Sequence, residues 1–137
     1  MNKGVIAALA ALLIGGVAFM LTQEKPAKEK ATPELAADVK IGVLLGFTGP
    51  IESLTPDMAS GAELAMKEAS DSGAFMGGSK VISVRGDSTC VDAAAATATA
   101  ERLITSDGVS AIMGAGCSGV TTAVLQNVAL ANGVVMM

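Results

Sequence analysis

The sequence predicts an α/β domain in which a parallel β-sheet is flanked by helices. Short runs of branched apolar residues alternate with longer segments in which apolar residues recur at helical spacing. Glycine, proline or a polar capping residue separates one segment from the next. Strands that alternate with helices are typical of βαβ units, which form parallel sheets through right-handed crossovers.

The first unit consists of a buried strand, a glycine-containing loop and a helix. Residues 40–45 read KIGVLL, an apolar run that predicts a strand covered on both faces. Thr55 is expected to cap the following helix, with Pro56 at its first position. Gly73 is expected to lie just beyond the end of this helix.

The faces of this first helix follow from residue spacing. Glu63 and Lys67 are four positions apart, so we expect them to form an ion pair on the polar side. The expected apolar stripe consists of Met58, Ala62, Ala65, Met66 and Ala69. Methionines at this spacing indicate core packing, and no cofactor role is assigned to them.

Further strands and helices follow with the same alternation. The last helix places Val120, Val124 and Val128 on one face, and Gly133 is expected to end it. The expected strands are residues 80–85, 109–113 and 134–137, and the expected helices are residues 91–106 and 119–132. Because the sequence stops inside the last of these strands, we expect residues 39–137 to form an incomplete domain.

The N-terminal region differs in composition from the rest of the chain. Residues 1–21 are expected to form a signal peptide or an anchor, because residues 4–21 carry no charge and follow Lys3, a pattern typical of an export signal. Gly16 and Ala18 are compatible with cleavage after Ala18, whereas an uncleaved run is long enough to span a bilayer. Residues 22–38 mix acids and bases with prolines and predict a charged linker.

The composition of the chain excludes several classes of function. The chain has 137 residues, 51% of them hydrophobic and 16% charged, which excludes intrinsic disorder. It has no histidine, which excludes histidine triads and histidine metal sites. Its formal net charge is −4 and it has no basic patch, so nucleic acid is not an expected partner.

The candidate sites are loops at the carboxyl ends of the strands, where open parallel sheets bind ligands. Residues 114–119 read GAGCSG, between an expected strand and an expected helix. This pattern is typical of a dinucleotide site, although that site belongs to the first strand–helix turn of its unit. Helix amides and the Ser118 hydroxyl also suit another small anion, such as a carboxylate. The structural alternative is that Ser118 is only the helix N-cap.

Two cysteines follow the second and third expected strands. If these strands are neighbours or next to neighbours, Cys90 and Cys117 lie close enough for a disulfide. An export signal implies an oxidising compartment in which the bond would persist. These two features favour a disulfide over the alternatives, which are two buried free thiols or a catalytic cysteine.

Several segments together resemble one known family. The segments KIGVLL, GFTGP, TPDMASGAELAMKEAS, DSTC and IMGAGCSGVT resemble, in order and spacing, the start of the periplasmic leucine/isoleucine/valine-binding proteins. These proteins are type I solute receptors of ABC transporters. The resemblance covers residues 39–137 and implies an incomplete N-terminal lobe, with a Rossmann-like parallel sheet and a second lobe beyond Met137.

The resemblance also implies roles for individual residues. The serine that follows the family's second cysteine binds the ligand α-carboxylate, and here it is Ser118. Leu54 stands where amino-acid binders often place a tryptophan. The family's early disulfide would join Cys90 and Cys117. The ligand-binding residues implied are Ser118, Gly119, Gly116, Ala115 and Leu54.

The implied function is that of an extracytoplasmic solute-binding receptor of an ABC importer. Its ligand would be a branched-chain or related amino acid, or an amide, held between two lobes and delivered to a membrane permease. No catalysis, cofactor or metal is expected, and the expected location is periplasmic. The alternatives are a nucleotide-dependent Rossmann enzyme that uses residues 114–119, and a sensory ectodomain of the same fold anchored through residues 4–21.

Overall fold

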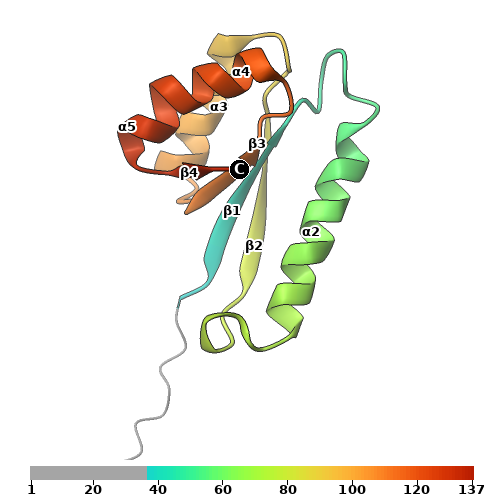
Figure 1. Ribbon diagram of the computed structural model, residues 1–137, viewed down its shortest axis with the longest axis vertical. Coiled ribbons are helices and arrows are strands. Elements are labelled where there is room, and N and C mark those ends of the chain that lie inside the picture. Colours follow the sequence, from blue (N-terminus) through green and yellow to red (C-terminus); the bar gives the residue numbers. More distant parts are fainter. Residues whose placement is uncertain (1–36) are drawn as a thin grey trace, which may run out of the picture. The chain divides into compact units, whose positions relative to one another are not determined.

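The computed structural model describes residues 37–137, which form a four-stranded parallel sheet. Val43 in the central part of the sheet lies opposite Arg85 on one side and Met113 on the other. The order of the strands is β2-β1-β3-β4 (Figure 1), and their bounds are β1 Val39–Leu45, β2 Val81–Asp87, β3 Ala111–Gly114 and β4 Val135–Met136. The predicted parallel α/β architecture is confirmed.

Helices cover both faces of this sheet. α2 (Thr55–Asp71) lies on one face against β1 and β2, and a short 3₁₀ turn, η1 (Phe75–Gly77), follows it (Figure 1). The other face carries α3 (Ala93–Thr105) and a continuous helical segment made of α4 (Ser118–Val124), the π-helical turn η2 (Leu125–Ala129) and α5 (Leu130–Asn132). The first crossover runs toward one edge of the sheet and the next two run toward the other. Because each crossover is right-handed, the helices are placed on opposite faces.

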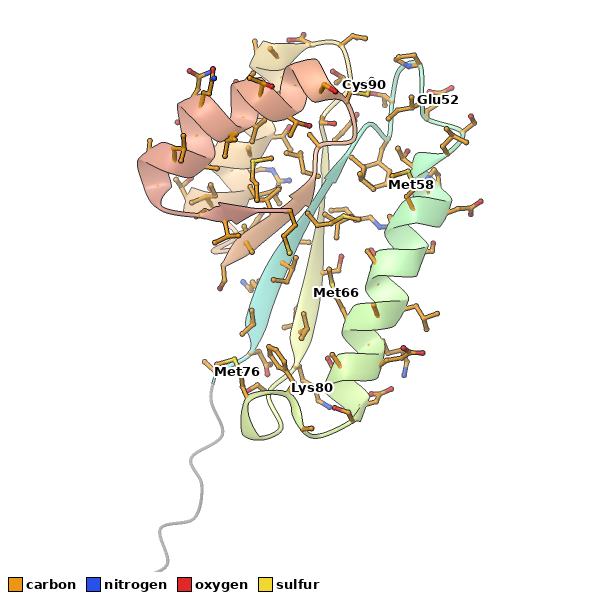
Figure 2. The ribbon with its side chains drawn as sticks, in the orientation of Figure 1. Glu52, Met58, Met66, Met76, Lys80 and Cys90 are labelled. Atoms are coloured by element: carbon orange, nitrogen blue, oxygen red, sulfur yellow. A yellow bond between two sulfur atoms is a disulfide. The ribbon has the colours of Figure 1, made fainter. Side chains whose placement is uncertain are left out.

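β1 is the centre of the packing, because its C-terminal half is buried on both faces. Its side chains alternate between the faces, as strand geometry requires. Leu44 faces α3 and α4 and belongs to a cluster with Ala100, Leu103, Ile112 and Val124. On the opposite face, a smaller cluster toward α2 contains Val43, Leu45 and Ala59, with Phe47, Met66 and Met113 packed against it. Figure 2 shows Met66 between α2 and the sheet.

The start of α2 differs from the prediction. The N-cap position is Leu54, and Thr55 is the first residue of the helix, with Pro56 following in the first turn. Thr55 is fully buried, and its Oγ1 donates a hydrogen bond to the Gly46 carbonyl oxygen at 3.0 Å. The hydroxyl therefore fixes the β1–α2 loop and does not cap the helix, so the capping prediction was wrong.

The buried face of α2 also differs in part from the predicted stripe. Ala59 is fully buried and Met66 is half-buried against the sheet. Met58 is 46% exposed, and Ala65 is exposed as well. A single helix on a wide sheet face buries only a narrow row of its residues. Part of the predicted apolar stripe of α2 therefore lies outside the buried row.

The predicted ion pair of α2 is replaced by two others. Glu63 receives hydrogen bonds from Arg85 Nε and a second guanidinium nitrogen, both at 2.7 Å, and so bridges α2 to β2. Lys67 pairs with Asp71, one turn further along the same helix. The prediction of a Glu63–Lys67 pair was wrong, because Arg85 on the neighbouring strand β2 lies within reach of Glu63 and binds both of its carboxylate oxygens.

The ends of the other helices agree with the predictions to within two residues. Asp92 caps α3 by accepting hydrogen bonds from the Ala94 and Ala95 amides. Val120, Val124 and Val128 are buried on one face, as predicted. Gly133 has a φ of 64° at the end of α5, a conformation that glycine adopts without strain.

The predicted signal peptide or anchor of residues 1–21, and residues 22–36 of the predicted linker, lie outside the described residues. Asp38, the last residue of the predicted linker, already joins the fold, since its Oδ1 accepts a hydrogen bond from the Lys80 amide at 2.8 Å. No helix between residues 37 and 137 has both the length and the hydropathy needed to cross a membrane.

Candidate functional site

The carboxyl ends of β1, β2 and β3 bring three loops together. Thr48, in the β1–α2 loop, donates from its Oγ1 and its amide to the Asp87 carboxylate, at 2.5 and 3.3 Å. The Ser88 amide donates to the Leu45 carbonyl oxygen at 2.8 Å. Gly49, with a φ of 89°, approaches so closely that a Cβ there would lie 2.4 Å from the Thr89 carbonyl oxygen. The first two loops are therefore in direct contact.

The Asp87 carboxylate is the main charged group in this contact. Partial burial by itself would raise its pKa, but hydrogen bonds from the Thr48 hydroxyl and from the Thr89 and Thr48 amides outweigh that effect. The pKa of Asp87 is therefore lowered below its ordinary value. The charged form of Asp87 holds the two loops together.

A disulfide joins the second loop to the third. Cys90 and Cys117 are bonded, with their Cα atoms 5.2 Å apart. β2 and β3 lie on either side of β1, so the two cysteines follow strands that are next to neighbours. The predicted pairing is present in the structure, and it fixes the β2–α3 loop against the residue that precedes Ser118.

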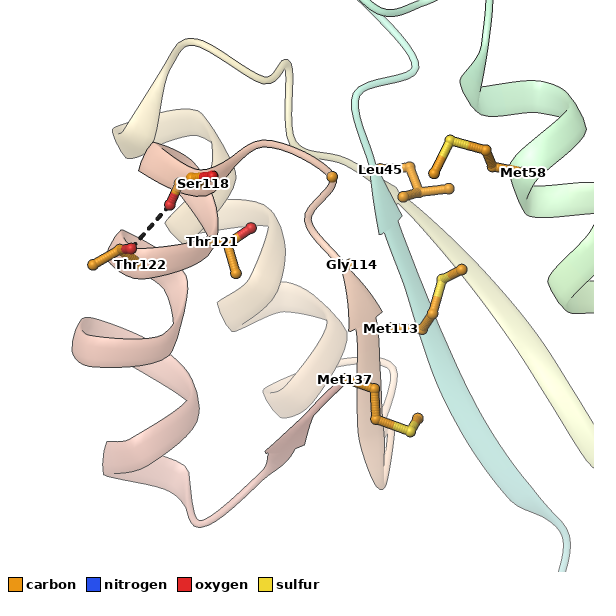
Figure 3. Close-up of a pocket in the computed structure, with 9 residues that line it drawn as sticks. Leu45, Met58, Met113, Gly114, Ser118, Thr121, Thr122 and Met137 are labelled. Atoms are coloured by element: carbon orange, nitrogen blue, oxygen red, sulfur yellow. Dashed lines mark hydrogen bonds between the residues drawn. The ribbon is translucent and has the colours of Figure 1, made fainter.

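A hollow of about 630 Å³ lies at the ends of β1 and β3 (Figure 3). Hydroxyl side chains of α4 form its polar part, and three methionines and a leucine form its apolar part. The lining residues are Leu45, Met58, Met113, Gly114, Gly116, Ser118, Thr121, Thr122 and Met137. The hollow therefore presents hydroxyl groups opposite a thioether-rich apolar wall.

Ser118 is an exposed residue at the first position of α4 and lines this hollow. Cys117 occupies the N-cap position, and no side chain caps the helix there. The alternative in which Ser118 is the N-cap is therefore wrong, because the helix begins at Ser118 itself, one residue earlier than that role requires. Within residues 37–137, no hydrogen bond engages the Ser118 Oγ; its carbonyl oxygen accepts one from Thr122 Oγ1 at 2.9 Å.

The other predicted ligand-binding residues lie in different surroundings. Gly116 lines the hollow beside Ser118. Ala115 is fully buried and packs in the core between the sheet and α4. Gly119 is exposed and lies outside the lining, as does Leu54, which is 61% exposed at the start of α2.

Met58, one turn beyond Leu54, is the residue of α2 that reaches the hollow. Met113 and Thr121 also line the hollow, and neither residue was predicted from the sequence. Met113 could have been found as the last side chain of an expected strand before a candidate loop. Thr121 could have been found because it lies three residues after Ser118 and so on the same face of the helix.

Gly114, the first glycine of the GAGCSG segment, has a structural explanation. Gly114 has a φ of 128°, and a Cβ there would lie 1.7 Å from the Leu44 carbonyl oxygen. Only glycine allows this close approach of β3 to β1, so the pattern does not require a nucleotide phosphate. Within residues 37–137, no three His, Cys, Asp or Glu side chains gather in a way that could hold a metal ion.

Comparison with known proteins agrees with this arrangement. The sequence profile of the periplasmic binding protein family matches residues 38–137. The chain belongs to this family. The Leu/Ile/Val-binding protein homolog 7 of Brucella melitensis is 36% identical to it over 126 residues, which cover 92% of the chain and 27% of that relative. This periplasmic binding protein chain therefore spans about a quarter of the length of the relatives it matches.

Solved structures of periplasmic binding proteins superimpose on the described fold. LivJ from Streptococcus pneumoniae, a branched-chain amino acid transporter substrate-binding protein in complex with isoleucine, has a TM-score of 0.64 and 29% identity, covering 72% of this chain and 28% of that one. A solute-binding protein of an ABC transporter from Rhodopseudomonas palustris, in complex with benzoate, has a TM-score of 0.60 and 26% identity, covering 72% and 26%.

Proposed function

We propose that residues 39–137 form part of the N-terminal lobe of a solute-binding receptor, and that Ser118 binds the carboxylate of a small apolar ligand. The observation that carries the proposal is the Ser118 hydroxyl, which lines the hollow with no partner among the described side chains and backbone groups. A free hydroxyl can donate to a carboxylate oxygen, and a hydrogen bond to a charged group is stronger than a neutral one.

The opposite wall of the hollow supports an apolar ligand body. Leu45, Met58, Met113 and Met137 carry no charge, and methionine side chains adapt their shape to what they contact. Isoleucine and benzoate, the ligands in the two related structures, each combine one carboxylate with an apolar body. A branched-chain amino acid or a related carboxylate therefore fits the chemistry of this lobe.

The whole receptor would work without catalysis. A second lobe would bury the ligand from the other side, and the closed form would deliver it to the membrane permease of an ABC importer. The family is one of solute-binding receptors and implies an extracytoplasmic location. Cleavage after Ala18 would release the receptor, and retention of residues 4–21 would anchor it.

The experiment is a Ser118→Ala substitution in the full-length protein. Ligand affinity is measured by calorimetry with isoleucine and with benzoate, and the tighter of the two serves as the probe. Loss of a hydrogen bond to a charged group should weaken binding by about ten-fold to a hundred-fold. The melting temperature should not change, since Ser118 does not cap α4.

Ser106→Ala provides the matched control, because Ser106 is also exposed but lies beyond the end of α3, outside the hollow. This control should leave affinity unchanged. Equal affinity of wild-type protein and Ser118→Ala for the probe would contradict the assignment of Ser118. A wild-type protein that binds neither compound would contradict the proposed ligand class.

A further inference from the structure

Two hydroxyl groups hold the short segment that leads into Ser118. The fully buried Ser88 Oγ donates to the Ala115 carbonyl oxygen at 2.9 Å. The Ala115 amide donates to Thr121 Oγ1 at 3.3 Å, and the same Oγ1 donates to the Cys117 carbonyl oxygen at 2.9 Å. One threonine hydroxyl therefore links the residues on both sides of Gly116.

This link matters because Gly116 itself restrains the segment very little. Its φ is 90°, a value that glycine adopts without strain, and it has no side chain to pack. The disulfide joins Cys117 to Cys90, whereas the backbone groups of Ala115 are held by hydrogen bonds. The hydrogen bonds of Ser88 and Thr121, together with the burial of Ala115, hold the backbone from Ala115 to Cys117.

The hydroxyl groups of the hollow also differ in how far they are already engaged. A threonine hydroxyl has one proton to donate. Thr121 uses it on the Cys117 carbonyl oxygen, and Thr122 uses it on the Ser118 carbonyl oxygen. Ser118 is the lining hydroxyl with no such bond among the described residues. Thr121 therefore donates its hydroxyl proton to the backbone, while the Ser118 hydroxyl remains free to donate to a ligand.

We propose that Thr121 is a positioning residue for ligand binding, which orients Ser118 through the backbone of residues 115–117. This proposal rests on the proposed function of Ser118. Thr121 lines the hollow, but its donor is engaged, so it acts through Ser118 and not through a hydrogen bond of its own to the ligand. Ser88 supports the same segment from the β2–α3 side.

A double-mutant cycle in the full-length protein tests this role. Affinity for the isoleucine or benzoate probe is measured for Thr121→Val, for Ser118→Ala and for the double variant. Thr121→Val keeps the shape and removes the hydroxyl, and should weaken binding by about ten-fold, within the range of coupling in a shared hydrogen-bond network. In the Ser118→Ala background, Thr121→Val should weaken ligand binding by less than about two-fold.

Two further variants separate positioning from a general loss of stability. Thr121→Ser keeps the hydroxyl and should retain nearly full affinity. Thr105→Val removes the equivalent bond to a carbonyl four residues earlier on α3, from Thr105 Oγ1 to the Glu101 carbonyl oxygen at 2.7 Å, and should leave affinity unchanged. The melting temperature of each variant is recorded with its affinity.

The outcomes distinguish this inference from the proposed function. A wild-type protein that binds neither probe overturns both. If the wild-type protein binds a probe but Thr121→Val reduces affinity equally with and without Ser118, the positioning role alone is overturned. A Thr121→Ser variant that binds as weakly as Thr121→Val overturns the same role. Loss that depends on Ser118 and is rescued by serine supports the proposal.

Discussion

Asp87 is the last residue of β2, and its carboxylate ties the β1–α2 loop to the β2–α3 loop through Thr48 and Thr89. Thr55 and Ser88 act in a similar way from buried positions, each donating to a carbonyl oxygen of a neighbouring loop. In residues 37–137, no buried side-chain nitrogen or oxygen lacks a hydrogen-bond partner. The loops around the hollow are therefore held by specific polar contacts.

Removal of the Asp87 charge should give a pH-dependent loss of stability. The pKa of Asp87 is lowered in the folded state, so its contribution is complete above the pKa of about 3.9 that an unfolded chain shows and disappears as the pH falls through the folded value. Asp87→Asn should lower the free energy of unfolding by about 1 kcal/mol at pH 7, the size of a hydrogen bond.

Urea unfolding of both proteins between pH 7 and pH 3 provides the measurement. The difference between them should shrink as the pH falls below about 4. Glu101→Gln, at an exposed position on α3, controls for the removal of one negative charge. A difference that stays constant over the whole pH range would show that the charge of Asp87 does not stabilise the loops.

α2 packs on the side of the sheet that has fewer buried apolar residues than the side that carries α3 and α4. Its side of the sheet has the smaller apolar cluster, and only Thr55, Ala59 and Ser70 of the helix are buried. The Glu63–Arg85 pair compensates in part, since it joins the middle of the helix to β2, and Arg85 also lies 5.4 Å above the Phe47 ring. The attachment of α2 is therefore more polar than that of the helices on the other face.

Glu63→Gln should loosen this attachment. Glu63 and Arg85 are 32% and 45% exposed, so solvent screens the pair and its loss should cost about 0.5–1 kcal/mol of unfolding free energy. Lys67→Gln breaks the Lys67–Asp71 pair within α2, whose two side chains are exposed, and should cost less than Glu63→Gln. Chemical denaturation compares the two variants, and an equal cost would show that the bridge to β2 adds nothing beyond an ordinary surface pair.

At the scale of the whole molecule, one covalent link and one sheet combine segments that are distant in the sequence. The disulfide spans 27 residues and closes a loop that contains α3 and β3. β1 pairs with both β2 and β3, so the three loops of the site meet only after these strands are assembled. The site depends on the integrity of this sheet edge.

Removal of the disulfide should destabilise the protein without changing the fold. A loop of this length contributes about 3–4 kcal/mol by the chain-entropy estimate. The Cys90→Ala/Cys117→Ala variant should lose about that amount in urea unfolding, and dithiothreitol should lower the stability of the wild-type protein to a similar level. The variant itself should not respond to dithiothreitol. A wild-type protein with two alkylatable thiols under native conditions would contradict the bond.

Sequence patterns alone predicted the order of the strands and the main helices, since these depend on neighbours along the chain, although they did not predict the 3₁₀ turn η1 or the π-helical turn η2. The apolar strand around Leu44, the valine face of the last helix and the glycine ends of the helices were all predicted from local spacing. The family resemblance was also readable from the sequence, because it rests on the order of short segments. The cysteine pairing was predicted from the expectation that β2 and β3 are close, together with the export signal.

The tertiary structure alone decided which groups meet across elements. Glu63 pairs with Arg85 and not with Lys67, and the Thr55 hydroxyl binds the Gly46 carbonyl oxygen instead of capping α2. In both cases a partner that the sheet brings close competes with a local one. Met58 reaches the hollow and Leu54 does not, which depends on the angle at which α2 crosses the sheet. Local spacing fixes the period of an element, but its rotation and tilt follow from packing, and these place the residues of the site.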